Sequence, residues 1–127
     1  MRVFKTKAFA RFARRERISD PRLLDAVQRA DRGLIDADLG CGVIKQRVAR
    51  PGEGRSGGHR VLVAWRPTAR AVFLFGFAKS ARGNIDDDEL ATAQEIAQIW
   101  LDADASALTK ALADGIIVEI GHGDEED

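Results

Sequence analysis

The sequence predicts an α+β domain with helices near its N-terminus, an antiparallel meander of three strands in the middle and a further helix toward its C-terminus. Apolar residues recur at helical spacing in two early segments, alternate or run continuously in three later ones, and return to helical spacing around residue 90. A chain of 127 residues suits one domain with a single core.

The first forty residues are expected to form a strand, two helices and a loop. A helix start at Asp20 is favoured because a carboxylate N-cap is followed by Pro21, and proline is well tolerated at the first helical position. Gly33 is expected to end that helix, since glycine readily adopts the left-handed conformation of a helix end. The expected elements are a strand at 1–6, helices at 7–17 and 20–32, and a loop at 34–42.

Three consecutive strands form the predicted meander. In the first, Ile44 and Val48 face one side of the sheet while Lys45 and Arg47 face the other, because side chains alternate along a strand. The third is almost entirely apolar, which indicates a central strand buried on both faces. Short connections make the neighbours antiparallel. The strands are expected at 43–49, 59–66 and 71–77, with the glycine-rich residues 52–58 as a loop.

Acidic residues mark the start of the last long helix. Asp86 is expected at the N-cap with Glu89 three positions later, as in a capping box, and negative charge there suits the helix dipole. The rest of the chain is expected to hold a short helix at 106–113, a strand at 116–120 and a disordered acidic tail at 121–127.

Charge is divided along the chain, although the net charge is zero. All but one of the 20 lysines and arginines fall in residues 1–82, whereas most of the 20 acids fall in residues 83–127. The basic part is a candidate electrostatic footprint for phosphates; alternatively, the two parts are solvated surfaces of opposite sign. A third interpretation is that the acidic terminal segment folds across the basic face and mimics nucleic acid.

The most informative segment surrounds the glycine-rich loop. Arginine's planar fork matches phosphate, and a meander brings cations from separate strands to one sheet surface. Such a cluster can neutralise a phosphodiester, stabilise the extra charge of a pentacoordinate transition state and donate a proton to the leaving 5′-oxygen. The alternative is a solvated basic face. The candidate cations are Lys45, Arg47, Arg50, Arg55, Arg60, Lys79 and Arg82.

Two further features of this segment are ambiguous. Residues 52–57 match G-x-G-x-x-G, but a dinucleotide fingerprint needs a following helix and here a strand follows. These glycines either allow close approach of an RNA backbone or form a mobile hairpin loop. His59 faces away from Arg60 in a regular strand, so it is either a structural histidine or an acid–base candidate.

The sequence gives no sign of a metal, a membrane span or a disulfide. Cys41, His59 and His122 lack metal-ligand spacing, and a helix start explains the acids at 86–89. No apolar run is long enough to span a bilayer, and the first residues lack the apolar core of a signal peptide. With its single cysteine the chain is expected in a reducing cytoplasm, without cofactor.

The pattern K-x-R-x-A-R-P-G-x-G-[KR]-S-G-G-x-R, starting at Lys45 and followed by G-F-A-K and N-I, resembles the RelE/ParE superfamily of toxins. It is most similar to the RelE-like, HigB-type branch of type II toxin–antitoxin modules. The resemblance covers residues 1–102 as a toxin domain, with residues 103–127 as a C-terminal extension. It implies the RelE-like, microbial-RNase-like fold, in which two N-terminal helices pack on a twisted antiparallel sheet.

The resemblance also implies a function and a set of site residues. It implies cleavage of mRNA in the ribosomal A site, without metal, by attack of a 2′-hydroxyl on the adjacent phosphate, and a cognate antitoxin that often carries a helix-turn-helix. Some members use a tyrosine or histidine near the C-terminus; this chain has no tyrosine, so Lys45 and His59 are candidates for that role. The implied catalytic residues are Lys45, Arg47, Arg60 and Lys79, and the implied RNA-binding residues are Arg50, Arg55, His59 and Arg82.

Two other functions stay open at this point. One is a non-enzymatic inhibitor of DNA gyrase, as in the ParE branch. The other is a catalytically weakened member that only binds RNA or protein. The basic sheet surface favours the ribonuclease.

Overall fold

The computed structural model describes residues 1–49 and 58–121. Within these ranges the fold is α+β, as predicted, with four helices and a six-stranded, mostly antiparallel sheet. The elements in chain order are β1 (Arg2–Thr6), α1 (Lys7–Glu16), α2 (Asp20–Asp31), β2 (Ala37–Gly40), β3 (Val43–Val48), β4 (His59–Arg66), β5 (Arg70–Ala78), α3 (Asp87–Asp102), α4 (Ala105–Ala113) and β6 (Ile117–Ile120).

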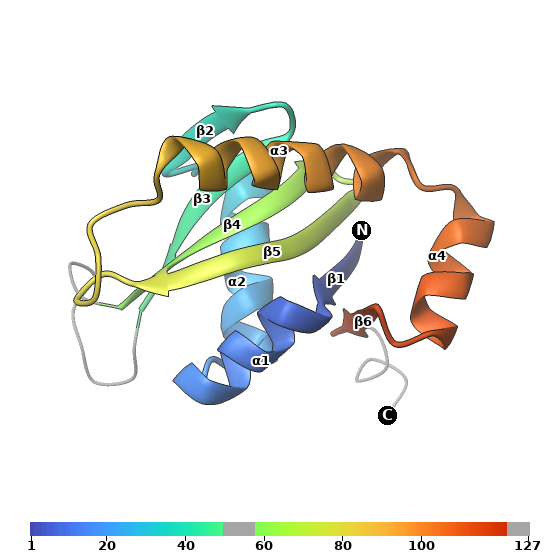
Figure 1. The fold of residues 1–127 in the computed structure, drawn as a ribbon, viewed down its shortest axis with the longest axis horizontal. Helices are drawn as coiled ribbons and strands as arrows, with labels where there is room; N and C mark the ends of the chain where they lie inside the picture. The colour runs from blue at the N-terminus through green and yellow to red at the C-terminus, as the bar shows by residue number, and fades with distance from the viewer. Residues whose placement is uncertain (50–57, 122–127) are drawn as a thin grey trace.

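The sheet has the strand order β2-β3-β4-β5-β1-β6. Strands β3, β4 and β5 form the predicted antiparallel meander. Strand β1 pairs in parallel with β5 and antiparallel with β6, so the first and last strands complete the sheet side by side (Figure 1). A parallel pair needs a long connection, and between β1 and β5 the two N-terminal helices and strands β2 to β4 supply it.

Helices cover both faces of the sheet (Figure 1). On one face, Phe9 of α1 and Leu23 of α2 belong to a core cluster that includes Phe73 of β5. On the other face, α3 and α4 pack over a second cluster, in which Ala97 of α3 lies with Leu62 of β4. The central strands are therefore buried on both sides, which explains the continuous apolar run of β5.

The helix ends follow the sequence signals, with one correction. The N-cap of α2 is Ser19 rather than Asp20, which is the first helical residue, and the Asp20 carboxylate accepts a hydrogen bond from Lys5 Nζ at 2.9 Å. Gly33 has the expected left-handed backbone, with φ +85°. The capping box of Asp86 and Glu89 is present at the start of α3.

The loop predicted at 34–42 is wrong in part, because Ala37–Gly40 form β2 and pair with β3. Its alanine, aspartate and glycine are weak strand formers, so the sequence gives no strand signal there. The pairing is possible because Gly40, Cys41 and Gly42 all have positive φ and turn the chain directly back into β3. Arg50, Arg55 and the acidic tail after Gly121 lie outside the described residues.

Candidate nucleic-acid interface

Three cations from two neighbouring strands meet on one face of the sheet. Lys45 and Arg47 share a face of β3, and Arg60 of β4 is the register partner of Arg47. The same face of these strands continues into Val43 and Leu62, which are buried in the cluster beneath α3. We call Lys45, Arg47 and Arg60 the basic face.

The two guanidinium groups of this face influence each other. Partial burial lowers the pKa of Arg60 below its usual value, and the neighbouring Arg47 cation lowers it further, while the Asp36 carboxylate acts in the opposite direction. An anion placed beside two such cations gains more than it would beside one exposed cation, because part of their hydration is already lost. The pair is therefore suited to a phosphate or to the more highly charged transition state of phosphoryl transfer.

The loop between β5 and α3 borders the basic face. Lys45 Nζ lies 3.4 Å from Asn84 Oδ1. The Arg82 guanidinium lies 5.7 Å from the ring centroid of Phe77, which is the register partner of Arg60 on β5. Arg82 therefore lies near the basic face, in contact with the ring of Phe77.

The first turn of α3 holds Arg82 in place. Arg82 Nη1 and Nη2 donate to the two carboxylate oxygens of Glu89 at 3.0 and 2.5 Å. The same Glu89 carboxylate accepts from the Asp86 backbone N–H at 2.9 Å. These hydrogen bonds raise the pKa of Arg82 and lower that of Glu89. The helix cap and the arginine therefore share one carboxylate.

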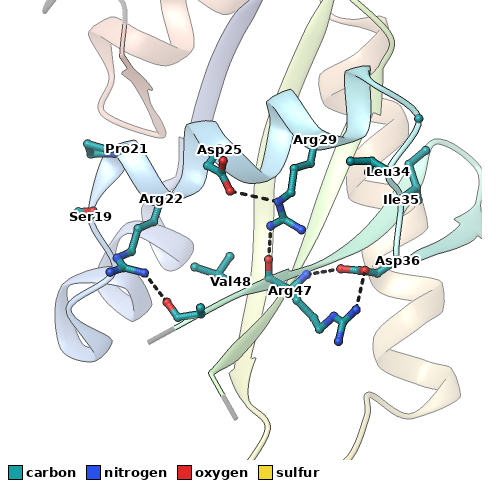
Figure 2. A pocket seen from close by; sticks show the side chains of 12 residues that line it. Ser19, Pro21, Arg22, Asp25, Arg29, Leu34, Ile35, Asp36, Arg47 and Val48 are labelled. Carbon is teal, nitrogen blue, oxygen red and sulfur yellow. Dashed lines mark hydrogen bonds and ion pairs between the residues drawn. The ribbon is translucent and has the colours of Figure 1, made fainter. Parts of the chain in front are cut away.

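A groove of about 870 Å³ lies between α2 and β3, and residues that line it form hydrogen bonds with Arg47 (Figure 2). The Arg47 backbone N–H donates to Asp36 Oδ2 at 2.6 Å, and its Nη2 lies 3.5 Å from Asp36 Oδ1. Arg29 of α2 donates from Nη2 to the Arg47 carbonyl oxygen, and Arg22 donates to the Ala49 carbonyl oxygen at 2.7 Å. Side chains thus form the hydrogen bonds of the backbone groups at the outer edge of β3, where β2 no longer pairs with this strand.

Asp36 is itself positioned by Gln46, a fully buried side chain of β3. Gln46 Oε1 accepts from the Asp36 backbone N–H at 2.8 Å. Its amide group donates to the carbonyl oxygens of Ala26 and Leu34 at 2.9 and 3.1 Å. The residue between Lys45 and Arg47 in sequence therefore ties the basic face to α2.

Residues 1–120 match the family model described as the RelE toxin of the RelE/RelB toxin–antitoxin system. The chain belongs to the RelE toxin family. This match confirms the family that the motif resembles, and a RelE toxin has a cognate antitoxin as its partner. No curated protein matches the chain.

The structure of this RelE toxin brings only some of the expected site residues together. Lys45, Arg47 and Arg60 form the basic face, and Arg82 lies beside it over Phe77. Lys79 directly follows β5, where its Nζ donates to the Gly83 carbonyl oxygen at 3.0 Å. The predicted RNA contacts of Arg50 and Arg55 fall outside the described residues.

His59 is separated from the basic face. It is 1% exposed and lies on the side of the sheet covered by α1, with Nε2 2.9 Å from Glu16 Oε1 and its ring edge-on to Phe12. Its position agrees with the alternation of β4 and with a structural role. A direct contact from His59 to RNA on the basic face is therefore not compatible with this arrangement.

Sequence reasoning missed Asp36, Gln46 and Phe77 as parts of the site. Asp36 lies in the loop before β2, as predicted, but nothing in the sequence pairs it with Arg47, and Gln46 faces away from the cations it supports. Phe77 had a usable signal, since it precedes Lys79 in the G-F-A-K motif and pairs with Arg60 in a meander.

The described part of the toxin offers neither a metal site nor a membrane-spanning helix. Residues 1–49 and 58–121 contain no group of three or more His, Cys, Asp or Glu side chains placed to hold a metal ion. None of the helices in these ranges has the length and apolar character needed to cross a membrane.

Proposed function

We propose that this toxin is an endoribonuclease that cleaves mRNA at the ribosome, without metal, by attack of a ribose 2′-hydroxyl on the adjacent phosphate. The observation that supports this most is the convergence of Lys45, Arg47 and Arg60 on one sheet face. In this reaction the 2′-oxygen loses its proton and bonds to phosphorus, the bond to the 5′-oxygen breaks, and the 5′-oxygen takes up one proton, so the overall reaction neither consumes nor releases a proton. The products are a 2′,3′-cyclic phosphate and a 5′-hydroxyl.

Each cation has a role in this proposal. Arg60 stabilises the charge of the pentacoordinate transition state, Arg47 binds the phosphate, and Lys45 donates the proton that the leaving 5′-oxygen needs. Lys79 and Arg82 orient the message. The chain has no tyrosine and His59 is buried elsewhere, so Lys45 is the residue we assign to proton transfer.

Replacing Arg60 tests the proposal. We expect Arg60→Ala to relieve the growth arrest that induction of the wild-type toxin causes, because the transition state loses its main cation, with activity falling by about a hundredfold or more. Growth is followed after induction, and circular dichroism and thermal unfolding show whether the variant is folded. Arg32→Ala, which removes an exposed arginine at the end of α2, is the matched control. Undiminished toxicity of a folded Arg60→Ala protein removes Arg60 from the mechanism.

The location of the toxin, the type of its antitoxin and the two alternative functions each have a distinct consequence. Action on translating ribosomes places the toxin in the cytoplasm, and a HigB-type member has a helix-turn-helix antitoxin encoded beside it. A gyrase inhibitor would leave messages intact and induce a DNA-damage response. A weakened RNA- or protein-binding member would do neither.

A further inference from the structure

A buried polar contact joins the end of α1 to the start of β4, and the proposed reaction does not use it. His59, the first residue of β4, is 1% exposed, and its Nε2 lies 2.9 Å from Oε1 of Glu16, the last residue of α1. A carboxylate at the C-terminal end of a helix is unfavourable, because the helix dipole is negative there. The helix alone therefore does not favour Glu16 at this position, and its contact with β4 offsets that effect.

The hydrogen bonds of the imidazole define its tautomer. Among residues 1–49 and 58–121, His59 Nδ1 is buried and has no hydrogen-bond partner. A buried N–H group without an acceptor is more costly than an unused lone pair, so the proton lies on Nε2. Nε2–H then donates to the Glu16 carboxylate, while the ring packs edge-on against Phe12 of α1 with the centroids 5.8 Å apart. A hydrogen bond and a ring contact thus fix the same imidazole.

The backbone of His59 lies beside the guanidinium group that matters most for the proposed reaction. Arg60 Nη1 donates to the His59 carbonyl oxygen at 3.3 Å. The preceding carbonyl, that of Gly58, accepts from the Lys79 backbone N–H at 3.0 Å. A shift of the first residue of β4 therefore moves an oxygen that the Arg60 side chain contacts.

The start of β4 is a place where an additional anchor has an effect. The described pairing of β3 with β4 ends at Val48 and His59, so Arg60 is one residue from the last paired position. The ends of paired strands open more readily than their middles. A cation that stabilises a transition state has to be held in place before the reaction. The contact from α1 holds β4 at this point, from the face of the sheet opposite the basic face.

We propose that Glu16 and His59 are positioning residues for the ribonuclease reaction. The hydrogen bond between them fixes the start of β4 and so holds Arg60 where it stabilises the transition state. The role of Arg60 comes from the proposed function, on which this inference rests. Neither Glu16 nor His59 contacts RNA at the basic face. Their effect passes through the sheet, from the face that α1 covers to the face that binds the message.

Two substitutions of His59 separate the hydrogen bond from the packing around it. His59→Phe keeps a ring against Phe12 but removes the donor, whereas His59→Gln supplies an amide N–H in place of Nε2–H. For cleavage of ribosome-bound mRNA, we expect His59→Phe to lower kcat about tenfold, because transition-state stabilisation falls steeply with misplacement of a cation. KM is expected to stay within about twofold, because Lys45 and Arg47 still bind the phosphate. In His59→Gln, kcat is expected to stay within about threefold of the wild type.

The carboxylate is tested in the same way. Glu16→Gln keeps an oxygen that accepts from Nε2–H and is expected to keep kcat within about threefold, whereas Glu16→Leu is expected to lower kcat about tenfold. If the two residues act through one hydrogen bond, Glu16→Leu/His59→Phe loses no more kcat than either single variant. Additive losses in the double variant, or equal losses in the conservative and disruptive variants, overturn the proposal.

Lys5→Met is the matched control for a general loss of stability. Lys5 Nζ lies 2.9 Å from Asp20 Oδ1, so it also joins the sheet to a helix, but its strand β1 is not a neighbour of β4. We expect this variant to lower the Tm and to leave kcat unchanged. Circular dichroism and thermal unfolding accompany every kinetic measurement. A loss of kcat in Lys5→Met equal to that in His59→Phe makes the effect one of stability and overturns the proposal.

A measurement on the Arg60 side chain itself separates this proposal from the proposed function. The Nε–H signal of Arg60 in proton–nitrogen correlation NMR spectra is identified by its loss in Arg60→Ala. We expect this signal to shift or broaden in His59→Phe and Glu16→Leu, and to stay in place in His59→Gln and Lys5→Met. An unmoved signal in His59→Phe overturns the proposal.

The two proposals then fail in different ways. If Arg60→Ala is inactive while His59→Phe keeps full kcat, the positioning role is wrong and the proposed function stands. If Arg60→Ala cleaves mRNA normally while the Arg60 signal moves in His59→Phe, the catalytic role of Arg60 is wrong, and the effect of Glu16 and His59 on its side chain stands.

Discussion

At the scale of single residues, Asp36 is the carboxylate that orients the Arg47 side chain. It accepts from the Arg47 backbone at 2.6 Å, lies 3.5 Å from the Arg47 guanidinium and is near enough to affect Arg60. It therefore does two opposing things to a bound phosphate. It orients a cation, and it places a negative charge beside the basic face.

These opposing effects give Asp36→Asn an unusual signature. We expect KM for RNA to fall by about threefold, since one repelling charge is removed. We expect kcat to fall by about tenfold, since Arg47 is less well oriented in the transition state. Steady-state cleavage of ribosome-bound mRNA by the purified toxin measures both constants.

Asp25→Asn serves as the control, because Asp25 is the other groove carboxylate and its contact is with Arg29 on the same helix. It is expected to leave KM and kcat unchanged. If Asp36→Asn raises KM, or changes neither constant, Asp36 does not act through Arg47.

The cations themselves were predictable from sequence, but their supports were not. Alternation along β3 places Lys45 and Arg47 on one face and His59 opposite Arg60, and both placements hold. Asp36 and Gln46 could not be found in this way, because their roles depend on β2 and on the packing of α2 against β3. Those contacts join residues far apart in the sequence, and no helical or strand-like spacing of residues predicts them.

At the scale of elements, the start of α3 couples the fold to the site. The Glu89 carboxylate caps the helix through the Asp86 N–H and holds Arg82 through two hydrogen bonds. Its pKa is lowered mainly by the Arg82 hydrogen bonds and further by the backbone one. Glu89→Gln keeps a residue that completes a capping box and removes the charge that Arg82 binds.

This coupling predicts a pH-dependent stability difference. A carboxyl group whose pKa is lower in the folded state contributes stability above its unfolded pKa, about 4.5 here, and loses it as the pH falls through the folded pKa. We therefore expect a lower Tm for Glu89→Gln than for the wild type at pH 7, and a difference that shrinks as the pH falls below 4.5. Thermal unfolding between pH 7 and pH 3 measures it.

Glu95→Gln, on an exposed position of the same helix, is the matched control and should follow the wild type throughout. A Glu89→Gln deficit that stays constant down to pH 3 would mean that the pair with Arg82 contributes nothing to stability.

The elements show where sequence patterns stop being sufficient. The meander and the capping box follow from local signals. The parallel pairing of β1 with β5 and the edge strand β2 depend on the whole sheet. Gly76 shows the same limit, because a Cβ there would lie 2.4 Å from the ring of Phe12, a contact between α1 and β5 that no spacing in the sequence reveals.

At the scale of the whole molecule, the uneven charge of the chain becomes two basic surfaces on opposite sides of one sheet. The basic face lies beside the loop that leads into α3. Exposed cations also lie on α1, and Figure 1 shows α1 and α3 on opposite sides of the sheet. The sequence predicted an electrostatic footprint for phosphates but could not divide it, because that division depends on which face each helix covers.

The central claim is that the toxin cuts mRNA through Arg60, and mapping the 5′ ends of cellular RNA after induction tests it most directly. We predict new 5′-hydroxyl ends inside codons of translated messages within minutes of inducing the wild type, and none after inducing a folded Arg60→Ala variant. Intact messages during growth arrest, together with a DNA-damage response, would contradict the claim.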